Sequence, residues 1–256
     1  LQTAVQQLNR RGDINNKKSR SISAYNKVIQ SLETQITSAK DNANAVIQKP
    51  IRTVQEVNNA LQQVNQLNQQ LTEAISQLQP LSNNDALKAA RLELENKINQ
   101  TVQTDGMTQQ SVDAYQNAKR EAQNESNTAL ALINNGDATE QQITTETDRV
   151  NQQTTNLTQA INGLTVNKEP LETAKTALQN NIDQVPSTDG MTQQSVANYN
   201  QKLQIAKNEI NTINNVLANN PDVNAIRTNK AEAERISNDL TQAKNNLQVD
   251  TQPLEK

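Results

Sequence analysis

A nine-residue segment occurs twice in this chain without change, and this duplication constrains the fold more than any other feature. Thr104–Val112 recurs as Thr188–Val196, at an offset of 84 residues. The serine of each copy is followed four residues later by a tyrosine, and Ser21 with Tyr25 has the same spacing. Identity at a fixed period is typical of repeat proteins. The three tyrosines of the chain therefore occupy one position of a repeat: Tyr25, Tyr115 and Tyr199.

Leucine-rich blocks extend the repeat over the whole chain. The block that begins at Leu71 matches those at Leu157 and Leu240, and each block has a further leucine seven residues after its first. A second block is shared by two repeats: Leu87, Ala90, Leu94 and Ile98 correspond to Leu171, Ala174, Leu178 and Ile182. We therefore predict three repeats, at residues 1–79, 80–165 and 166–248, and the start of a fourth at residues 249–256. The first repeat can lack part of its first helix.

The spacing of apolar residues predicts three helices in each repeat. In the third segment of every repeat, apolar residues recur every seven positions, which indicates an amphipathic helix packed as in a coiled coil and not a strand. These positions are Val57, Val64, Leu71 and Leu78, then Ile143, Val150, Leu157 and Leu164, then Ile226, Ala233, Leu240 and Leu247. Capping patterns mark the starts of these helices: Thr53 with Glu56, Thr139 with Gln142, and Asp222.

Three antiparallel helices place the entrance and the exit of a repeat at opposite ends of its bundle. The sequence therefore predicts an all-α protein of tandem three-helix bundles arranged end to end as an elongated rod. Its joints are short: Gln79–Asn83, Thr165–Lys168 and Gln248–Gln252. Pro170 fits the first turn of a helix. Pro80 would remove a hydrogen bond from a helical joint, so we expect a kink there.

The composition suits thin bundles and removes several kinds of chemistry. Only 33% of the residues are apolar, and Asn and Gln together number 72, so each helix can bury one narrow stripe. With no cysteine and no histidine, the chain lacks disulfides, thiolate chemistry and the commonest general base and metal ligand. A net charge of −3 gives no basic footprint for nucleic acid, and no apolar run reaches the length of a membrane span. We assign no catalytic, cofactor-binding or metal-binding residue.

The repeat resembles the FIVAR module, a three-helix repeat of bacterial surface proteins. The similar features are the Thr-x-x-Ser start of helix two with its tyrosine (Thr108, Ser111, Tyr115; Thr192, Ser195, Tyr199), the Asn-x-x-x-Thr entry to helix three (Asn135–Thr139) and the ending Leu157–Leu164. The wider Asn-, Gln- and Thr-rich sequence resembles the giant staphylococcal extracellular matrix-binding proteins. The first repeat departs from the pattern, because Asp13-Ile14-Asn15 replaces the Asp-Gly-Met-Thr sequence. The start of its second helix is therefore not fixed by the resemblance.

Two loop motifs are candidates for recognition. Arg11-Gly12-Asp13 is the tripeptide that integrins bind, but the other repeats lack it, and we favour a polar loop in which Gly12 ends the first helix. The repeated loops Thr104–Thr108 and Thr188–Thr192 could contact a ligand. A turn followed by a helix cap needs the same residues, and we favour that interpretation. Asp105 and Asp189 lie in these loops, but no calcium-type loop surrounds them.

Aromatic and acidic residues give no better site. Tyr25, Tyr115 and Tyr199 fall on apolar helix faces, so we expect core packing with the hydroxyl groups at the rim. Glu93 and Glu95 lie on different faces of their helix. Ligand-binding residues therefore stay unknown at the level of sequence.

The resemblance implies a long, fibrous protein attached to a Gram-positive cell surface and linked to fibronectin and other matrix material, with no catalytic residues. We predict an extracellular structural segment, monomeric in isolation, that acts as a spacer, tether or adhesin stalk. The alternative is a repeat module that binds host fibronectin through avidity. An enzyme is the least favoured class, because thin bundles leave little room for a desolvated pocket. Neither nucleic acid nor a membrane is an expected partner.

Overall fold

The computed structural model describes residues 1–251, and helices make up about 74% of them. No β-strand occurs in this part of the chain. Because globular proteins average about one third helix, the expected all-α class is confirmed. Residues 252–256, the end of the predicted fourth repeat, lie outside the described residues.

The chain packs as two compact units. The first unit comprises Leu1–Asn99 with Arg120–Thr155, and the second comprises Gln100–Lys119 with the chain from Asn156 onward. The division passes through α5 (Gln109–Ile133) and α6 (Glu140–Asn162), so each of these two helices contributes one part to each unit. The repeat boundaries at residues 79, 165 and 248 stay a prediction.

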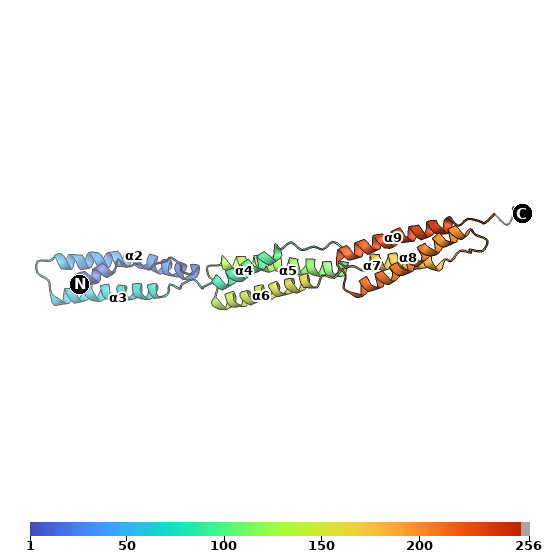
Figure 1. Cartoon of the computed structure of the whole chain (residues 1–256). Coiled ribbons are helices and arrows are strands. Elements are labelled where there is room, and N and C mark those ends of the chain that lie inside the picture. Colours follow the sequence, from blue (N-terminus) through green and yellow to red (C-terminus); the bar gives the residue numbers. More distant parts are fainter. Residues whose placement is uncertain (252–256) are drawn as a thin grey trace. The chain divides into compact units, whose positions relative to one another are not determined.

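Three helices open the first unit: α1 (Gln2–Gln7), α2 (Ser19–Gln48) and α3 (Val54–Ser76). α1 packs against both of the others, and α2 and α3 lie side by side (Figure 1). Their shared core is narrow and rich in small residues: Leu8, Leu32, Ile36, Ala39, Ala43, Ala60, Val64, Leu67 and Leu71. The alanines allow the helix backbones to approach closely, so few large side chains are needed to fill the space between them.

α4 (Asp85–Ile98) contacts residues 120–133 of α5 within the first unit. Its predicted apolar stripe is buried: Leu87, Ala90, Leu94 and Ile98. At this contact Arg91 Nε donates to the Ser126 carbonyl oxygen (3.0 Å), and Ser126 Oγ donates to Glu95 Oε1 (3.2 Å). Ser126 is fully buried, and both its polar groups have partners, as burial requires.

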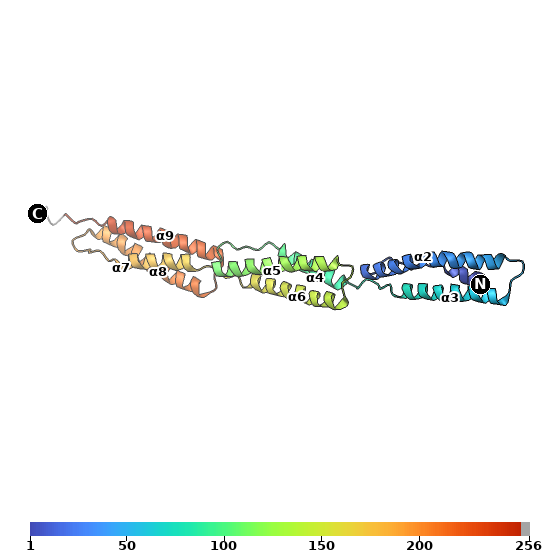
Figure 2. The same ribbon diagram turned by 180° about the vertical axis from the view of Figure 1, so that it is seen from behind.

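The second unit contains α7 (Glu169–Asp183), α8 (Gln193–Ala218) and α9 (Val223–Asn245). All three pack against one another (Figures 1 and 2). The predicted apolar positions Leu171, Ala174, Leu178, Ile182, Tyr199, Ile226, Ala233 and Leu240 share one core with Ala206, Ile213, Ile236 and Ala243, which were not predicted, and the predicted Leu247 packs against this core while partly exposed. The seven-residue spacing of α9 therefore marks its buried face.

Most of the predicted helix caps are present. Thr53 and Glu56 form a capping box at α3, and the Thr139 backbone N–H donates to Gln142 Oε1 (2.9 Å) at α6. Asp222 Oδ1 accepts from the Ala225 backbone N–H (2.7 Å) at α9. Pro170 lies in the first turn of α7, where a missing backbone donor costs nothing.

A feature absent from the sequence prediction recurs three times. The loop before α2, α5 or α8 pairs through its backbone with the linker that follows α3, α6 or α9, and we call each pairing a clasp. The bridged residues are Lys17 with Pro80 in the first clasp, Met107 with Val166 in the second, and Met191 with Val249 in the third. The first clasp lies within the first unit, and the other two lie within the second.

Each clasp contains two backbone hydrogen bonds, and their lengths differ little between clasps. The bonds are Lys18 N–H to Gln79 O (2.8 Å) and Leu81 N–H to Asn16 O (3.0 Å); Thr108 N–H to Thr165 O (2.7 Å) and Asn167 N–H to Gly106 O (2.9 Å); and Thr192 N–H to Gln248 O (2.7 Å) and Asp250 N–H to Gly190 O (2.8 Å). The linkers are therefore held by backbone hydrogen bonds that do not depend on the bridged side chains.

The repeated serine completes every clasp. Ser111 Oγ donates to the Thr108 carbonyl oxygen (2.9 Å) in the first turn of α5 and accepts from the Thr165 backbone N–H (3.1 Å) in the linker. Ser21 accepts in the same way from Gln79, and Ser195 from Gln248. A hydroxyl group can donate and accept at once, which explains why this position of the repeat carries serine.

Three expectations for the loops and joints need correction. Pro80 does not kink a helical joint, because α3 ends at Ser76, α4 begins at Asp85, and Pro80 lies in the clasp between them. Gly12 does not end the first helix, because α1 stops at Gln7. In the first repeat, Asn16 and Lys17 take the places of Gly106 and Met107, so the residues that replace the Asp-Gly-Met-Thr sequence are 15–18 and not 13–15.

Candidate functional site

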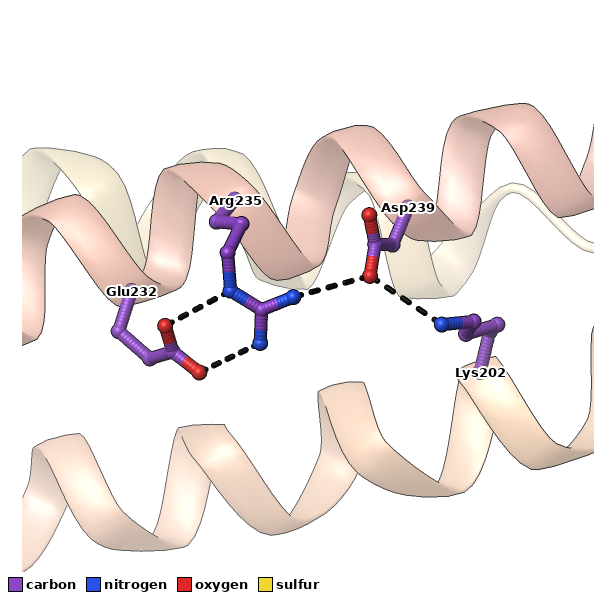
Figure 3. Close-up of polar contacts among 4 residues, drawn as sticks. All are labelled: Lys202, Glu232, Arg235 and Asp239. Carbon is purple, nitrogen blue, oxygen red and sulfur yellow. Dashed lines mark hydrogen bonds and ion pairs between the residues drawn. The ribbon is translucent and has the colours of Figure 1, made fainter.

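A network of four charged side chains lies on α8 and α9 (Figure 3). Arg235 holds both oxygens of Glu232, with Nε–Oε2 at 2.9 Å and Nη2–Oε1 at 2.6 Å. Its Nη1 donates to Asp239 Oδ2 (3.1 Å), which also accepts from Lys202 Nζ on α8 (3.2 Å). The i, i+3 and i, i+4 spacing on α9 places its three members on one helix face.

Electrostatics within this network favour the charged forms of Glu232 and Arg235. The guanidinium of Arg235 lowers the pKa of Glu232, first by hydrogen bonding and then by its charge, and Glu232 raises the pKa of Arg235 in return. Because Arg235 and Glu232 are both well exposed, solvent screens their attraction, and such pairs add little stability. The network therefore presents a hydrated, internally satisfied surface that a polar partner could contact.

A second candidate is the groove between α5 and α6 in the first unit, with a volume of about 590 Å³. Its lining includes Ala131, Leu132, Glu146 and Arg149. Burial is the main cause that raises the pKa of Glu146, followed by the charge of Glu125 and a hydrogen bond with it. Arg149 Nη1, at 3.8 Å from Glu146 Oε2, opposes this shift.

A half-buried glutamate recurs at one register of the repeat, and the sequence analysis missed it. Glu125 and Glu209 are 84 residues apart, the offset of the duplicated segment. Each has a buried Oε1 without a hydrogen-bond partner. Burial and the nearby charge of Glu232 raise the pKa of Glu209. The repeat offset was the available signal, but glutamate at a helix position normally indicates an exposed face.

Each residue of the Arg-Gly-Asp tripeptide forms a hydrogen bond within the folded chain. The Gly12 backbone N–H donates to the Tyr25 hydroxyl (2.7 Å), and a Cβ at Gly12 would lie 2.5 Å from Leu78 Cδ1. Asp13 Oδ1 accepts from the Asn15 backbone N–H (2.9 Å). Arg11 folds back onto the Leu8 carbonyl oxygen (3.2 Å). This arrangement matches the favoured interpretation of a structural loop.

The repeated Thr-Asp-Gly-Met-Thr loops form the expected turn and cap. The Met107 backbone N–H donates to the Thr104 carbonyl oxygen (3.2 Å), and Gly106 has a φ of +79°. Thr192 caps α8 through the Ser195 backbone N–H (3.4 Å). Both loops also form clasps, so their backbone atoms hold linkers. Among residues 1–251, no group of three or more His, Cys, Asp or Glu side chains is arranged to hold a metal ion.

The tyrosines are core residues, as expected, but their hydroxyl groups differ. All three are at most 4% exposed. The Tyr25 hydroxyl has the Gly12 partner, and Lys119 Nζ lies 6.0 Å from the ring centroid of Tyr115. The Tyr199 hydroxyl is buried without a hydrogen-bond partner, so the expectation that it reaches the rim is wrong.

No helix in the described range is long and apolar enough to cross a bilayer.

Comparison with known proteins identifies one family. The FIVAR domain model matches residues 1–72, 90–158 and 174–248. Extracellular matrix-binding protein EbhB of Staphylococcus aureus (strain Newman) is 54% identical over 255 residues, which is 100% of this chain and 4% of that protein. Extracellular matrix-binding protein ebh of Staphylococcus aureus (strain NCTC 8325 / PS 47) is also 54% identical, over 100% of this chain and 3% of that protein. The chain thus spans a small part of these relatives, which are named as matrix-binding proteins.

One solved structure is also similar in sequence. That structure concerns extracellular matrix binding protein (Embp)-mediated adherence of Staphylococcus epidermidis to fibronectin. Its sequence is 30% identical to this chain. The match covers 62% of this chain and 94% of that chain, with a TM-score of 0.36.

Proposed function

Because the chain belongs to the FIVAR domain family, we propose that it is a spacer segment of an extracellular, cell-surface-attached bacterial protein. In this proposal three repeats (residues 1–79, 80–165 and 166–248) follow one another end to end, and residues 249–256 begin a fourth. The segment acts mechanically and performs no catalysis. Its task is to hold an adhesive or anchoring region at a distance from the cell envelope.

The observation that carries this proposal is the clasp. A stalk needs joints that resist bending, whereas an unpaired linker of this length samples many conformations. Each of the three clasps supplies two backbone hydrogen bonds and a third bond from its serine. At about 0.5–1.5 kcal/mol net for each hydrogen bond, a clasp outweighs the thermal energy that would let the linker swing.

Display on a bacterial surface tests the spacer role. An epitope would be placed beyond one, two or three tandem copies of residues 1–248, and its height above the cell wall would be measured by super-resolution imaging. A stiff spacer predicts a constant increase in height for each added copy. Height that grows with the square root of copy number, as for a flexible chain, contradicts it.

A second candidate function is direct binding of host matrix, favoured by the names of the relatives at 54% identity. The exposed polar faces, such as the network around Arg235 and Asp239, would make weak contacts that repetition strengthens. Immobilised fibronectin is the appropriate probe, with the purified chain in solution. Micromolar binding that weakens in Arg235→Ala supports the second function. If the chain does not bind fibronectin, only the spacer role remains.

A further inference from the structure

The most exposed large apolar side chains of residues 1–251 lie in two places. Ile51 (89% exposed) and Val54 (77%) belong to the turn that leads into α3. Val185 (72%) and Val249 (63%) belong to the loop before α8 and to the third clasp. Isolated apolar side chains are common on surfaces, but pairs at defined positions of a repeat can be compared with their equivalents elsewhere in the chain.

In the second unit the equivalents of two of these residues are covered. Val223 is the first residue of α9, as Val54 is of α3, and its side chain lies directly against Gly106 of the second clasp. Val166, the equivalent of Val249, packs against the core of α7, α8 and α9. In the second unit, the start of α9 therefore packs against the second clasp.

Within the first unit, the turn before α6 docks on the first clasp in a similar way. Asp137 Oδ1 accepts from the Arg20 backbone N–H (2.9 Å). Arg20 lies in the first turn of α2, which follows the loop of the first clasp. A Cβ at Gly136 would lie 3.1 Å from Ser19 Oγ. In the second unit a charge pair has this role, since Arg227 Nη2 lies 3.3 Å from Asp105 Oδ2. The docking mode therefore tolerates different side chains.

We propose that the turn Lys49–Val54 and the third clasp are complementary, and that they dock two copies of this chain head to tail. The clasp side is open among residues 1–251, because none of their atoms lies within 4 Å of a Cβ built on Gly190. Charge favours the pairing: Arg52 lies in the turn, while Asp189 and Asp250 flank the clasp. The two surfaces differ, so each copy can contact one neighbour through the turn and another through the clasp, which is a heterologous contact.

The expected association between separate molecules is weak. Two or three apolar side chains and a few charges cannot approach the roughly 1,000 Å² that stable interfaces bury. Within a longer chain the same surfaces would be tethered, and a short tether supplies an effective concentration in the millimolar range. The contact would then be occupied between consecutive repeats. This inference does not depend on whether the chain binds matrix.

Paramagnetic relaxation tests the docking directly. The chain has no cysteine, so Gln193→Cys places a single nitroxide next to the third clasp of an unlabelled copy. A second, methyl-labelled wild-type copy reports through Ile51, Val54 and the exposed control Leu92. At about 1 mM protein, where millimolar affinities become visible, we expect loss of methyl intensity at Ile51 and Val54 and none at Leu92.

Two controls make the result specific. A nitroxide at Glu93→Cys, on the exposed face of α4, should leave Ile51 and Val54 unchanged. Val54→Asp in the labelled copy, an exposed position that should tolerate the charge, should abolish the loss at Ile51, and added salt should reduce it in the wild type. Full intensity at Ile51 and Val54, or equal loss at Leu92, would overturn the proposal.

Discussion

The first clasp and the two later clasps reach one geometry from different sequences. Asn16 has a φ of 55° in the first clasp, where Gly106 (79°) and Gly190 (69°) have positive φ in the others. Asparagine and glycine are the residues that adopt this left-handed conformation most readily. A clasp therefore requires one residue with left-handed backbone, two backbone hydrogen bonds and a serine, while the bridged side chains can vary.

The second and third clasps offer the opposite comparison, since they share one sequence in different surroundings. Gly106 lies against Val223, so that a Cβ there would be only 3.3 Å from the Val223 Cβ and would overlap one of its methyl groups. Gly190 has open space around it. The same Thr-Asp-Gly-Met-Thr sequence should therefore respond differently to one substitution.

The largest expected effect is that of alanine at these two glycines. Gly106→Ala combines a left-handed alanine, at about 1–2 kcal/mol, with overpacking against Val223, at about 1–3 kcal/mol. Gly190→Ala carries the first cost alone. Chemical denaturation of the two variants should show the larger loss for Gly106→Ala, and equal losses would mean that the contact with Val223 does not persist in solution.

Phenylalanine variants of Tyr25 and Tyr199 should show a smaller difference in stability than the two glycine variants. The Tyr25 hydroxyl accepts from the Gly12 backbone N–H (2.7 Å), whereas the Tyr199 hydroxyl is buried without a partner. Removing a hydrogen-bond partner costs about 1–3 kcal/mol when a buried group is left unsatisfied. Tyr25→Phe should therefore lower stability, and Tyr199→Phe should leave it unchanged or raise it. Thermal unfolding decides between this result and equal losses, which would place a partner at Tyr199.

The smallest expected effect is the pH dependence that Glu146 and Glu209 confer. Burial raises the pKa of both carboxyl groups in the folded chain. Their contribution to stability is therefore fully present below the unfolded pKa and is lost as the pH rises through the folded pKa. The melting temperature should be higher at mildly acidic pH than above neutrality, and Glu146→Gln should flatten this profile. The exposed control Glu93→Gln should leave it unchanged.

The sequence predicts the helices well because periodicity reports burial directly. Leu157 and Leu240, with their partners every seven residues, lie on the buried faces of α6 and α9. Thr53 and Asp222 cap as expected, since a cap depends on residues three positions apart. Local rules thus suffice wherever the interacting groups are close along the chain.

The clasps and the partial burial of Glu125 and Glu209 were not predicted, for a different physical reason. Thr108 and Thr165 are distant in sequence, and their pairing uses backbone atoms that leave no side-chain pattern. Serine at position 111 predicts a helix start, but its second bond to the linker depends on the folded bundle. Glu125 resembles a solvated helix residue until a neighbouring helix covers it. Interactions that arise only on folding therefore set the limit of sequence reasoning.

The proposed spacer role requires successive repeats to stay in line, and small-angle X-ray scattering of the dilute monomer tests this requirement. Three bundles end to end would span about 120 Å at a helical rise of 1.5 Å per residue, which corresponds to a radius of gyration of about 35 Å. A compact chain of this length would have a radius of gyration of about 18 Å. We expect a radius of gyration of about 35 Å, and a value of about 18 Å would rule out the proposed spacer.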